Sequence, residues 1–183
     1  MSYDRRNAIS NKYYLKSDDT SEYDSFEIET RVKIEEINDL SDSDNLKIGF
    51  TCSTFDMFHP GHVIMLEDSK NQCDILVVGI QTDPTLDRPD SKNVPIQDLD
   101  ERKIMVSSCR HIDYVVKYST ENDLYNILTL LKPDVRILGS DWKGKEYTGH
   151  EIKDINIHWH DRSVHTYSTT NLRYRAYMAE LSN

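Results

Sequence analysis

One segment near the middle of the chain constrains the fold more than any other. Between Asp74 and Gln81 the sequence is Ile-Leu-Val-Val-Gly-Ile, an uninterrupted apolar run. A strand that is apolar on both faces is typical of the interior of a parallel sheet, because helices cover such a sheet on both sides. The segment therefore predicts an α/β protein rather than an antiparallel one.

The sequence around this segment alternates between strand and helix patterns. Expected strands span 46–52, 74–81, 114–116, 135–139 and 155–159. Expected helices span 60–72 and 98–109, then a segment between Thr120 and Pro133, and a last one from Thr169. Repeated strand–helix units predict a Rossmann-like, doubly wound parallel sheet. Residues 82–97 contain three prolines and are expected to form a long loop, which is often functional in a small domain.

The first 45 residues differ from the rest and are expected to form an acidic N-terminal extension to a domain spanning 46–183. Residues 1–25 lack periodicity and are expected to be mobile. In residues 26–34, apolar residues or Thr alternate with charged ones, which predicts a half-buried strand. Residues 41–45 are all Ser, Asp or Asn and predict a solvated linker.

Composition excludes several classes of function. The chain has 183 residues and a formal net charge of -10, so neither nucleic acid nor an acidic membrane is an expected partner. No apolar run is long enough to cross a membrane, and the start lacks the apolar stretch of a signal peptide. The three cysteines, Cys52, Cys73 and Cys109, show no paired spacing. We therefore expect a reducing, cytoplasmic location and no disulfide framework.

The strongest chemical pattern is His59-Pro60-Gly61-His62, which follows the first expected strand and opens a helix. A helix start offers free N–H groups and the positive end of the helix dipole, which suits phosphate. Two imidazoles three residues apart can reach the same anion, and Gly61 allows a ligand close to the backbone. Two surface histidines or a metal pair are the alternatives. The position between a strand and a proline-opened helix favours the phosphate site.

A second cluster precedes the last helix. Ser168, Thr169 and Thr170 place three hydroxyls at the helix start, with Arg162 a few residues upstream. Hydroxyls and free N–H groups together can hold a phosphate, although simple helix capping explains the same residues. Elsewhere, His111, His158 and His160 have no convincing partners in the sequence, and we expect structural or surface roles for them.

Taken together, these segments resemble the HxGH nucleotidyltransferase family. Within it, they are most similar to the cytidylyltransferase branch that acts on glycerol 3-phosphate. Residues 53–62 have the sequence S-T-F-D-M-F-H-P-G-H, similar to the family's G-T-F-D-x-x-H-x-G-H. The other similar segments, in the family's order, are 101–103, 110–115, 139–145 and 166–170.

The resemblance implies transfer of CMP from CTP to an alcohol phosphate, with CDP-glycerol and pyrophosphate as the expected products. It implies that His59 and His62 bind the triphosphate and stabilise the transition state. Ser168, Thr169 and Thr170 would hold the β- and γ-phosphates. Mg²⁺ would accompany the triphosphate, and no residues are assigned to hold a metal ion.

The resemblance also assigns the rest of the site. It places four residues beside the nucleotide, which are named in the next sentence, and Arg162 is a fifth candidate for the same role. The four are Thr54, Phe55, Asp141 and Trp142. Arg102 would hold an anion, expected to be the acceptor phosphate, and Lys92 would neutralise the α-phosphate, with Arg88 as the second choice. A homodimer is expected, because residues 110–115 form an interface region in relatives.

Three departures from the family pattern bear on these assignments. Ser53 replaces a glycine, Ser163 stands where an arginine opens the closing motif, and His165 stands where an acidic residue is common. Two other functions stay open, the first because the sequence does not assign a pocket for the base and the second because of these departures. One is an adenylyltransferase that acts on a sugar phosphate or another phosphate, and the other is a non-catalytic nucleotide-binding module. Release of pyrophosphate separates the enzymes from the binding module.

Overall fold

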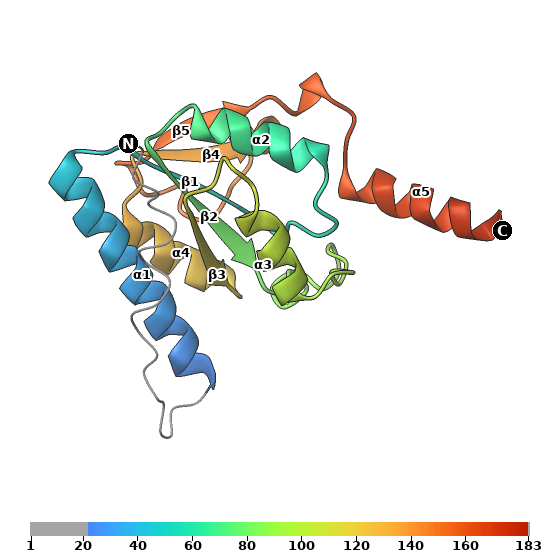
Figure 1. The fold of residues 1–183 in the computed structure, drawn as a ribbon, viewed down its shortest axis with the longest axis horizontal. Coiled ribbons are helices and arrows are strands. Elements are labelled where there is room, and N and C mark those ends of the chain that lie inside the picture. Colours follow the sequence, from blue (N-terminus) through green and yellow to red (C-terminus); the bar gives the residue numbers. More distant parts are fainter. Residues whose placement is uncertain (1–21, 183) are drawn as a thin grey trace, which may run out of the picture.

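The computed structural model describes residues 22–182, which form a five-stranded sheet with helices on both faces (Figure 1). The strands are β1 (Ile48–Ser53), β2 (Ile75–Gln81), β3 (Tyr114–Tyr118), β4 (Val135–Gly139) and β5 (Asn156–His160). Their order in the sheet is β3-β2-β1-β4-β5, and every neighbouring pair is parallel. This arrangement confirms the predicted Rossmann-like sheet. Strand addition changes direction between β1 and β4, which is where such sheets bind ligands.

Each strand and helix expected from residue 46 onward is present, with ends within two residues of the prediction. The helices are α1 (Glu22–Asp44), α2 (Pro60–Lys70), α3 (Leu99–Ser107), α4 (Glu121–Leu131) and α5 (Thr169–Leu181). Two short 3₁₀ turns, η1 (Ser140–Trp142) and η2 (Arg162–Val164), follow β4 and β5.

The helices bury both faces of the sheet. Leu66 of α2 and Val106 of α3 pack on one face, and Leu124 and Leu128 of α4 pack on the other. Every residue of β2 is buried as a result. The apolar run between Asp74 and Gln81 is thus explained by two separate cores that meet at one strand.

The strand expected over 26–34 is wrong, because these residues belong to α1. Burial along α1 follows helical spacing: Ile34 and Ile37 are buried, Leu40 is half-buried, and Ile28 is 51% exposed. The alternating pattern concealed an apolar stripe that continues past residue 34 at the spacing of a helix. That continuation was the signal that distinguishes the two structures.

The linker expected over 41–45 is solvent-exposed for most of its length, but it is helical up to Asp44. Asn45 then adopts a left-handed conformation with φ of 50°, as Asn often does after a helix. Of the segment predicted to be mobile, residues 1–21 lie outside the described residues. The remainder, 22–25, begins α1.

The extension is packed onto the domain rather than separate from it. Lys33 donates a hydrogen bond to the carbonyl oxygen of Val115 at 3.1 Å, and Asn38 donates one to that of Leu130 at 3.0 Å. α1 therefore covers the open side of α4 and the edge near β3 (Figure 1).

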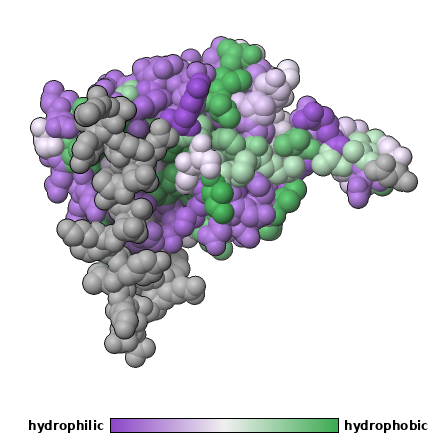
Figure 2. All heavy atoms as spheres, viewed as in Figure 1, coloured by the Kyte–Doolittle hydropathy of each residue, from purple (hydrophilic) through white to green (hydrophobic). Residues whose placement is uncertain are grey.

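The surface is mostly hydrophilic on the face in Figure 2, and α5 projects from the body of the molecule. No residue of α5 is buried, and Tyr174, Tyr177 and Leu181 are each more than 60% exposed. Within residues 22–182, no helix has the length and apolar character needed to cross a bilayer.

Candidate active site

Two adjoining cavities open at the carboxyl ends of β1 and β4. The smaller has a volume of about 290 Å³ and lies towards α2, and the larger has a volume of about 620 Å³ and lies towards α4. The two cavities adjoin, because six residues line both of them. The shared residues are Cys52, Ser53, Leu138, Asp141, Trp142 and Arg162.

The two motif histidines form the start of α2 and line the smaller cavity. His59 is the N-cap, and its Nδ1 accepts a hydrogen bond from the N–H of Gly61 at 3.1 Å. Nδ1 of His62 accepts from the N–H of His59 at 3.3 Å. The two rings stack with centroids 3.9 Å apart. Both imidazoles are therefore fixed by the local backbone, which explains the need for this spacing at a helix start.

These contacts also fix where the protons lie. Because each Nδ1 accepts a hydrogen bond, each neutral ring carries its proton on Nε2 and presents it as a donor. Burial and the neighbouring His59 lower the pKa of His62 to about 3, and burial and His165 also lower the pKa of His59. Both rings are consequently neutral hydrogen-bond donors at pH 7.

The second cluster faces the first across the smaller cavity. Thr169 Oγ1 lies 3.3 Å from Nε2 of His59 and donates to the carbonyl oxygen of Asp56. Ser168 caps α5 by accepting from the N–H of Asn171 at 3.1 Å, so the capping alternative holds for this residue. Thr170 also lines the cavity. Two helix starts thus converge on one space, which is the geometry of an anion site.

The turn between β1 and α2 is held by the motif aspartate. Asp56 is buried and accepts from the N–H groups of Ile96 and Gln97, each at 3.0 Å, and from Arg173 at 2.5 Å. Phe55 adopts a left-handed backbone with φ of 54°, which is rare for an aromatic residue and typical of functional turns. Ser53, in contrast, ends β1 outside the left-handed region, so its backbone does not require the family's glycine.

Thr54 and Phe55 differ in their access to the site. Thr54 lines the larger cavity, whereas the side chain of Phe55 is only 1% exposed and belongs to the core. Only the backbone of Phe55 is therefore available to a ligand.

Arg102 does not reach either cavity. Its side chain is 2% exposed, and it donates hydrogen bonds only to main-chain carbonyl oxygens of the described residues. The carbonyls belong to Thr54, Gln81, Thr82, Gln97 and Asp98. The guanidinium ties the two ends of the 82–97 loop to the motif turn, and we correct the expected role of Arg102 from anion binding to holding this loop.

Four other expected residues do meet at the cavities. Arg162 forms an ion pair with Asp141 at 3.3 Å, and both residues, with Trp142, line both cavities. Lys92 lines the larger cavity and makes no ion pair with a described residue. Burial and the charge of Arg88 lower the pKa of its ammonium group.

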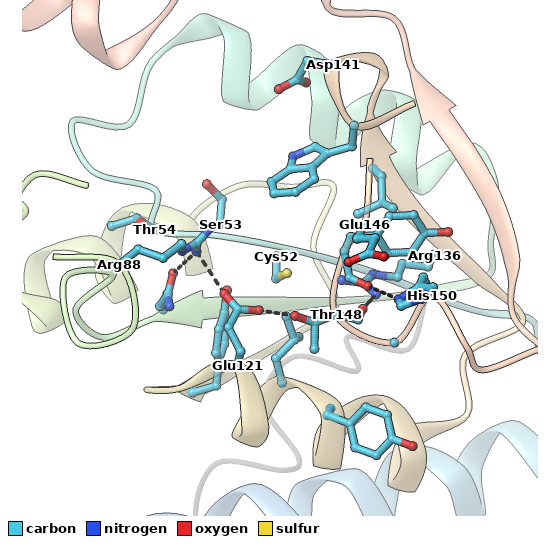
Figure 3. A pocket seen from close by; sticks show the side chains of 18 of the residues that line it. Cys52, Ser53, Thr54, Arg88, Glu121, Arg136, Asp141, Glu146, Thr148 and His150 are labelled. Atoms are coloured by element: carbon cyan, nitrogen blue, oxygen red, sulfur yellow. Dashed lines mark hydrogen bonds and ion pairs between the residues drawn. The ribbon is translucent and has the colours of Figure 1, made fainter. Parts of the chain in front are cut away.

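Three residues of the larger cavity were not predicted to belong to a site together (Figure 3). Arg88, expected only as a substitute for Lys92, pairs with Glu121 at 3.0 Å, and Glu121 in turn accepts a hydrogen bond from Thr148. These residues come from a loop, from α4 and from the segment after η1. No local pattern marks them, because only the fold brings them together.

Arg136 of β4 is the most unusual of the residues that the sequence did not reveal. It is 3% exposed, donates to the carbonyl oxygen of Thr148, and lies 5.3 Å from the ring of Tyr147. Its Nε has no partner, and it forms no ion pair with a described residue. The sequence did contain one indication of this site, because Arg136 interrupts the otherwise apolar strand segment Val-Arg-Ile-Leu. A buried cation without a countercharge is costly unless a ligand supplies one.

His158 and His160 also have a partner that the sequence did not reveal. Both contact the carboxylate of Asp68 on α2, at 3.1 Å and 2.7 Å. This group lies beside the smaller cavity, which His160 lines. Among residues 22–182, no three His, Cys, Asp or Glu side chains converge as metal ligands do.

Two helix starts and a pair of imidazoles lie where strand addition changes direction, between β1 and β4. This arrangement is typical of an α/β protein that binds phosphate. Residues 50–175 match the family model described as Cytidylyltransferase-like, and the chain belongs to this family of nucleotidyltransferases. The predicted family is confirmed.

Curated relatives include the bifunctional protein HldE of Campylobacter concisus, which is 38% identical over 68% of this chain and 26% of the relative. HldE of a Bradyrhizobium species is 31% identical over 81% of this chain and 29% of the relative. The chain thus spans about a quarter of the length of these relatives. The sequence predicted a particular similarity to glycerol-3-phosphate cytidylyltransferases. These relatives do not support that finer prediction, because they are HldE proteins.

Two solved structures share the fold. A lipopolysaccharide core biosynthesis protein from Thermoplasma volcanium is 26% identical, with a TM-score of 0.52 over 67% of this chain and 99% of that chain. A pantoate-beta-alanine ligase from Francisella tularensis is 18% identical, with a TM-score of 0.51 over 76% of this chain and 70% of that chain. The second likeness concerns the fold alone.

Proposed function

We propose that this chain transfers a nucleoside monophosphate from a nucleoside triphosphate to the phosphate of a sugar or another polyol. One observation carries the proposal: two cavities of different chemistry meet at the ends of β1 and β4. The smaller offers paired imidazole donors and two helix starts, which suit a triphosphate. The larger offers Arg136 for an anion, and Glu121 and Thr148 for hydroxyl groups.

In this reaction an oxygen of the acceptor phosphate forms a bond to the α-phosphorus. The bond from that phosphorus to the bridging oxygen breaks, and pyrophosphate leaves with the electron pair. The protein need not supply a covalent nucleophile, because alignment and charge stabilisation dominate such transfers. Nε2–H of His59 and His62 would donate to the phosphoryl oxygens as charge shifts to the leaving group.

Adenylyl transfer to a sugar phosphate is our first candidate, and cytidylyl transfer to glycerol 3-phosphate is the second. The curated relatives reported above carry the name HldE rather than that of a cytidylyltransferase, which favours the first. The Thermoplasma structure is that of a lipopolysaccharide core biosynthesis protein. The family description keeps the second candidate open.

Mg²⁺ would enter bound to the oxygens of the triphosphate and shield its charge. Asp141 is the one carboxylate among the described residues that line the smaller cavity, and it pairs with Arg162. The residues described therefore fit a metal ion that is carried by the substrate rather than one held by a protein cage.

A homodimer also stays a proposal. Residues 110–115 lie on the surface around the start of β3, and α5 exposes Tyr174, Tyr177 and Leu181. Exposed aromatic residues on a projecting helix are typical of association surfaces. Light scattering at working concentration tests this, and a monomeric mass would contradict it.

The decisive experiment measures pyrophosphate release with Mg²⁺ and each of ATP, CTP, GTP and UTP. Acceptors are a set of sugar phosphates and glycerol 3-phosphate, with His59→Ala as the inactive control. Release with ATP and a sugar phosphate, lost in the variant, supports the first candidate. Release only with CTP and glycerol 3-phosphate supports the second. Silence with all pairs, despite nucleotide binding, indicates a binding module.

A further inference from the structure

His165 lies beside the start of α2 and lines the smaller cavity. A Cβ placed on Gly61 would come within 2.8 Å of Cε1 of His165 and 3.0 Å of Cε1 of His59, so the two rings flank the glycine. Because Cε1 is bonded to both ring nitrogens, Nδ1 and Nε2 of His165 also lie near this helix start. A third imidazole thus borders the space in which the free N–H groups of α2 favour a phosphate.

Three nitrogen atoms near this position lack hydrogen bonds. Nδ1 and Nε2 of His165 are buried and have no partner among the described residues, and the same is true of Nε2 of His160. Buried polar atoms are usually paired, because burial removes their hydrogen bonds to water. Three unpaired atoms on the wall of one cavity indicate that a ligand completes their hydrogen bonds.

His160 is held in one orientation and offers a hydrogen-bond acceptor. Its Nδ1 lies 2.7 Å from Oδ2 of Asp68, and its side chain is only 4% exposed. Because Nδ1 donates to the carboxylate, Nε2 of the neutral ring carries a lone pair. The 6.3 Å between the ring centroids of His160 and His165 is about 1 Å more than a direct N–H···N bond would give. No hydrogen bond to a described residue holds the His165 ring, so a small rotation towards His160 breaks none.

The smaller cavity also lacks an unpaired positive charge. Arg162 is the one Lys or Arg among the described residues that line it, and Arg162 pairs with Asp141 at 3.3 Å. His59 and His62 are neutral at pH 7, because their pKa values are lowered. A triphosphate carries several negative charges, and hydrogen bonds between charged partners stabilise it more than bonds from neutral donors do.

We propose that His165 binds the pyrophosphate part of the triphosphate as an imidazolium, with one N–H donating to a phosphate oxygen and the other to Nε2 of His160. This pairing satisfies all three unpaired nitrogens with a single anion. Asp68 and His160 are then positioning residues, because they hold the acceptor that orients His165. Binding takes up one proton, which the His165 ring gains as the anion enters.

This inference rests on the proposed function in one respect, that the larger cavity holds the acceptor. In-line transfer places the acceptor and the leaving pyrophosphate on opposite sides of the α-phosphorus. His165 lines the smaller cavity and not the larger. It therefore lies on the side of the leaving group, where it contacts the β- and γ-phosphates.

The groups around His165 make its charge depend on the anion. The Arg162–Asp141 pair is neutral overall, and Asp68 shares its negative charge with His158 and His160. The bound pyrophosphate therefore adds the largest negative charge near the ring and favours its protonation. The other titratable groups nearby are His59, His62, Asp161 and Tyr167.

Magnesium pyrophosphate is the probe that tests the inference, because its binding does not depend on the base. Calorimetry at pH 7 measures its affinity for the full chain, for His165→Ala and for His165→Gln. We expect His165→Ala to bind it roughly tenfold to a hundredfold more weakly, the size of a hydrogen bond to a charged group. His165→Gln keeps one donor but no charge, so its affinity should lie between those of the wild type and His165→Ala. His111→Ala, which lies outside both cavities, should bind as the wild type does.

Proton uptake separates a binding role for His165 from a structural one. The titrations are repeated at the same pH in two buffers that differ in their heat of ionisation, which gives the number of protons taken up on binding. The wild type should take up more than His165→Gln, by up to about one proton per site. Asp68→Asn should reduce this excess, because the acceptor on His160 is no longer fixed. Equal uptake by the wild type and His165→Gln would overturn the inference.

The outcomes distinguish this inference from the proposed function. Pyrophosphate release by the wild type, with an unchanged affinity in His165→Ala, would overturn the inference alone. Affinity and proton uptake that depend on His165, without pyrophosphate release from any acceptor, would support the phosphate site and overturn the enzyme. A wild type that does not bind magnesium pyrophosphate would overturn the inference, and the release assay would still decide the proposed function.

Discussion

The two cavities are neighbours, yet they are built in opposite ways. The smaller has paired imidazoles and hydroxyl groups from two continuous segments, 59–62 and 168–170, each at a helix start. The larger takes its charges from a loop, a helix, a strand and the segments after β4 and β5, and two ion pairs form among them. The comparison teaches that the triphosphate end is defined by local backbone geometry, whereas the other end depends on tertiary placement.

The sharpest test of the smaller cavity removes one imidazole. His59→Ala loses a donor to the phosphoryl groups and the cap of α2, so kcat/KM should fall by about 10²–10³. The assay is pyrophosphate release at saturating acceptor. His111→Ala, which removes a histidine that lines neither cavity, should keep wild-type activity. Equal activity of the two variants would remove His59 from the mechanism.

Arg102 tests what holds the larger cavity open. Arg102→Gln leaves several buried carbonyls without donors, so the free energy of unfolding should fall by about 3 kcal/mol. Denaturant unfolding measures this, with Lys103→Gln on the same helix as the control. An undiminished stability together with a raised KM for the acceptor would restore the anion-binding role that the sequence suggested.

Arg136 tests whether the larger cavity binds the acceptor. Arg136→Gln keeps a donor for Thr148 but removes the buried charge, so KM for the acceptor should rise roughly tenfold to a hundredfold. KM for the nucleoside triphosphate should stay within a factor of about two. The exposed Arg110→Gln is the matched control. A change in the nucleotide KM instead would place Arg136 with the smaller cavity and break the division drawn above.

The sequence predicted the sheet, its helices and the smaller cavity because each depends on local patterns. The apolar run before Gln81 required burial on both faces, and His59 and His62 acquire their orientation within one turn of helix. Arg136, Glu121 and Thr148 could not be predicted as a group, since they are far apart in the chain. The prediction for residues 26–34 was wrong because a local alternating pattern indicated a strand. The contact of α1 with α4 favours a helix there instead.

The last prediction concerns protonation in the smaller cavity. The ordinary pKa of His62 is 6.5, and burial and the neighbouring His59 lower it to about 3 in the folded chain. Between these values the unfolded chain binds a proton that the folded chain does not, so stability falls as the pH falls from about 6.5 towards 3. His62→Asn keeps an acceptor for the N–H of His59 but does not titrate. The loss of unfolding free energy between pH 7 and pH 5 should therefore be smaller in this variant by about 2 kcal/mol. In the wild type, NMR should show no titration of the His62 ring between pH 5 and pH 8. A midpoint near pH 6.5 would mean that a fraction of the His62 rings is protonated near neutral pH. The smaller cavity would then contain a cationic group, as the larger cavity does.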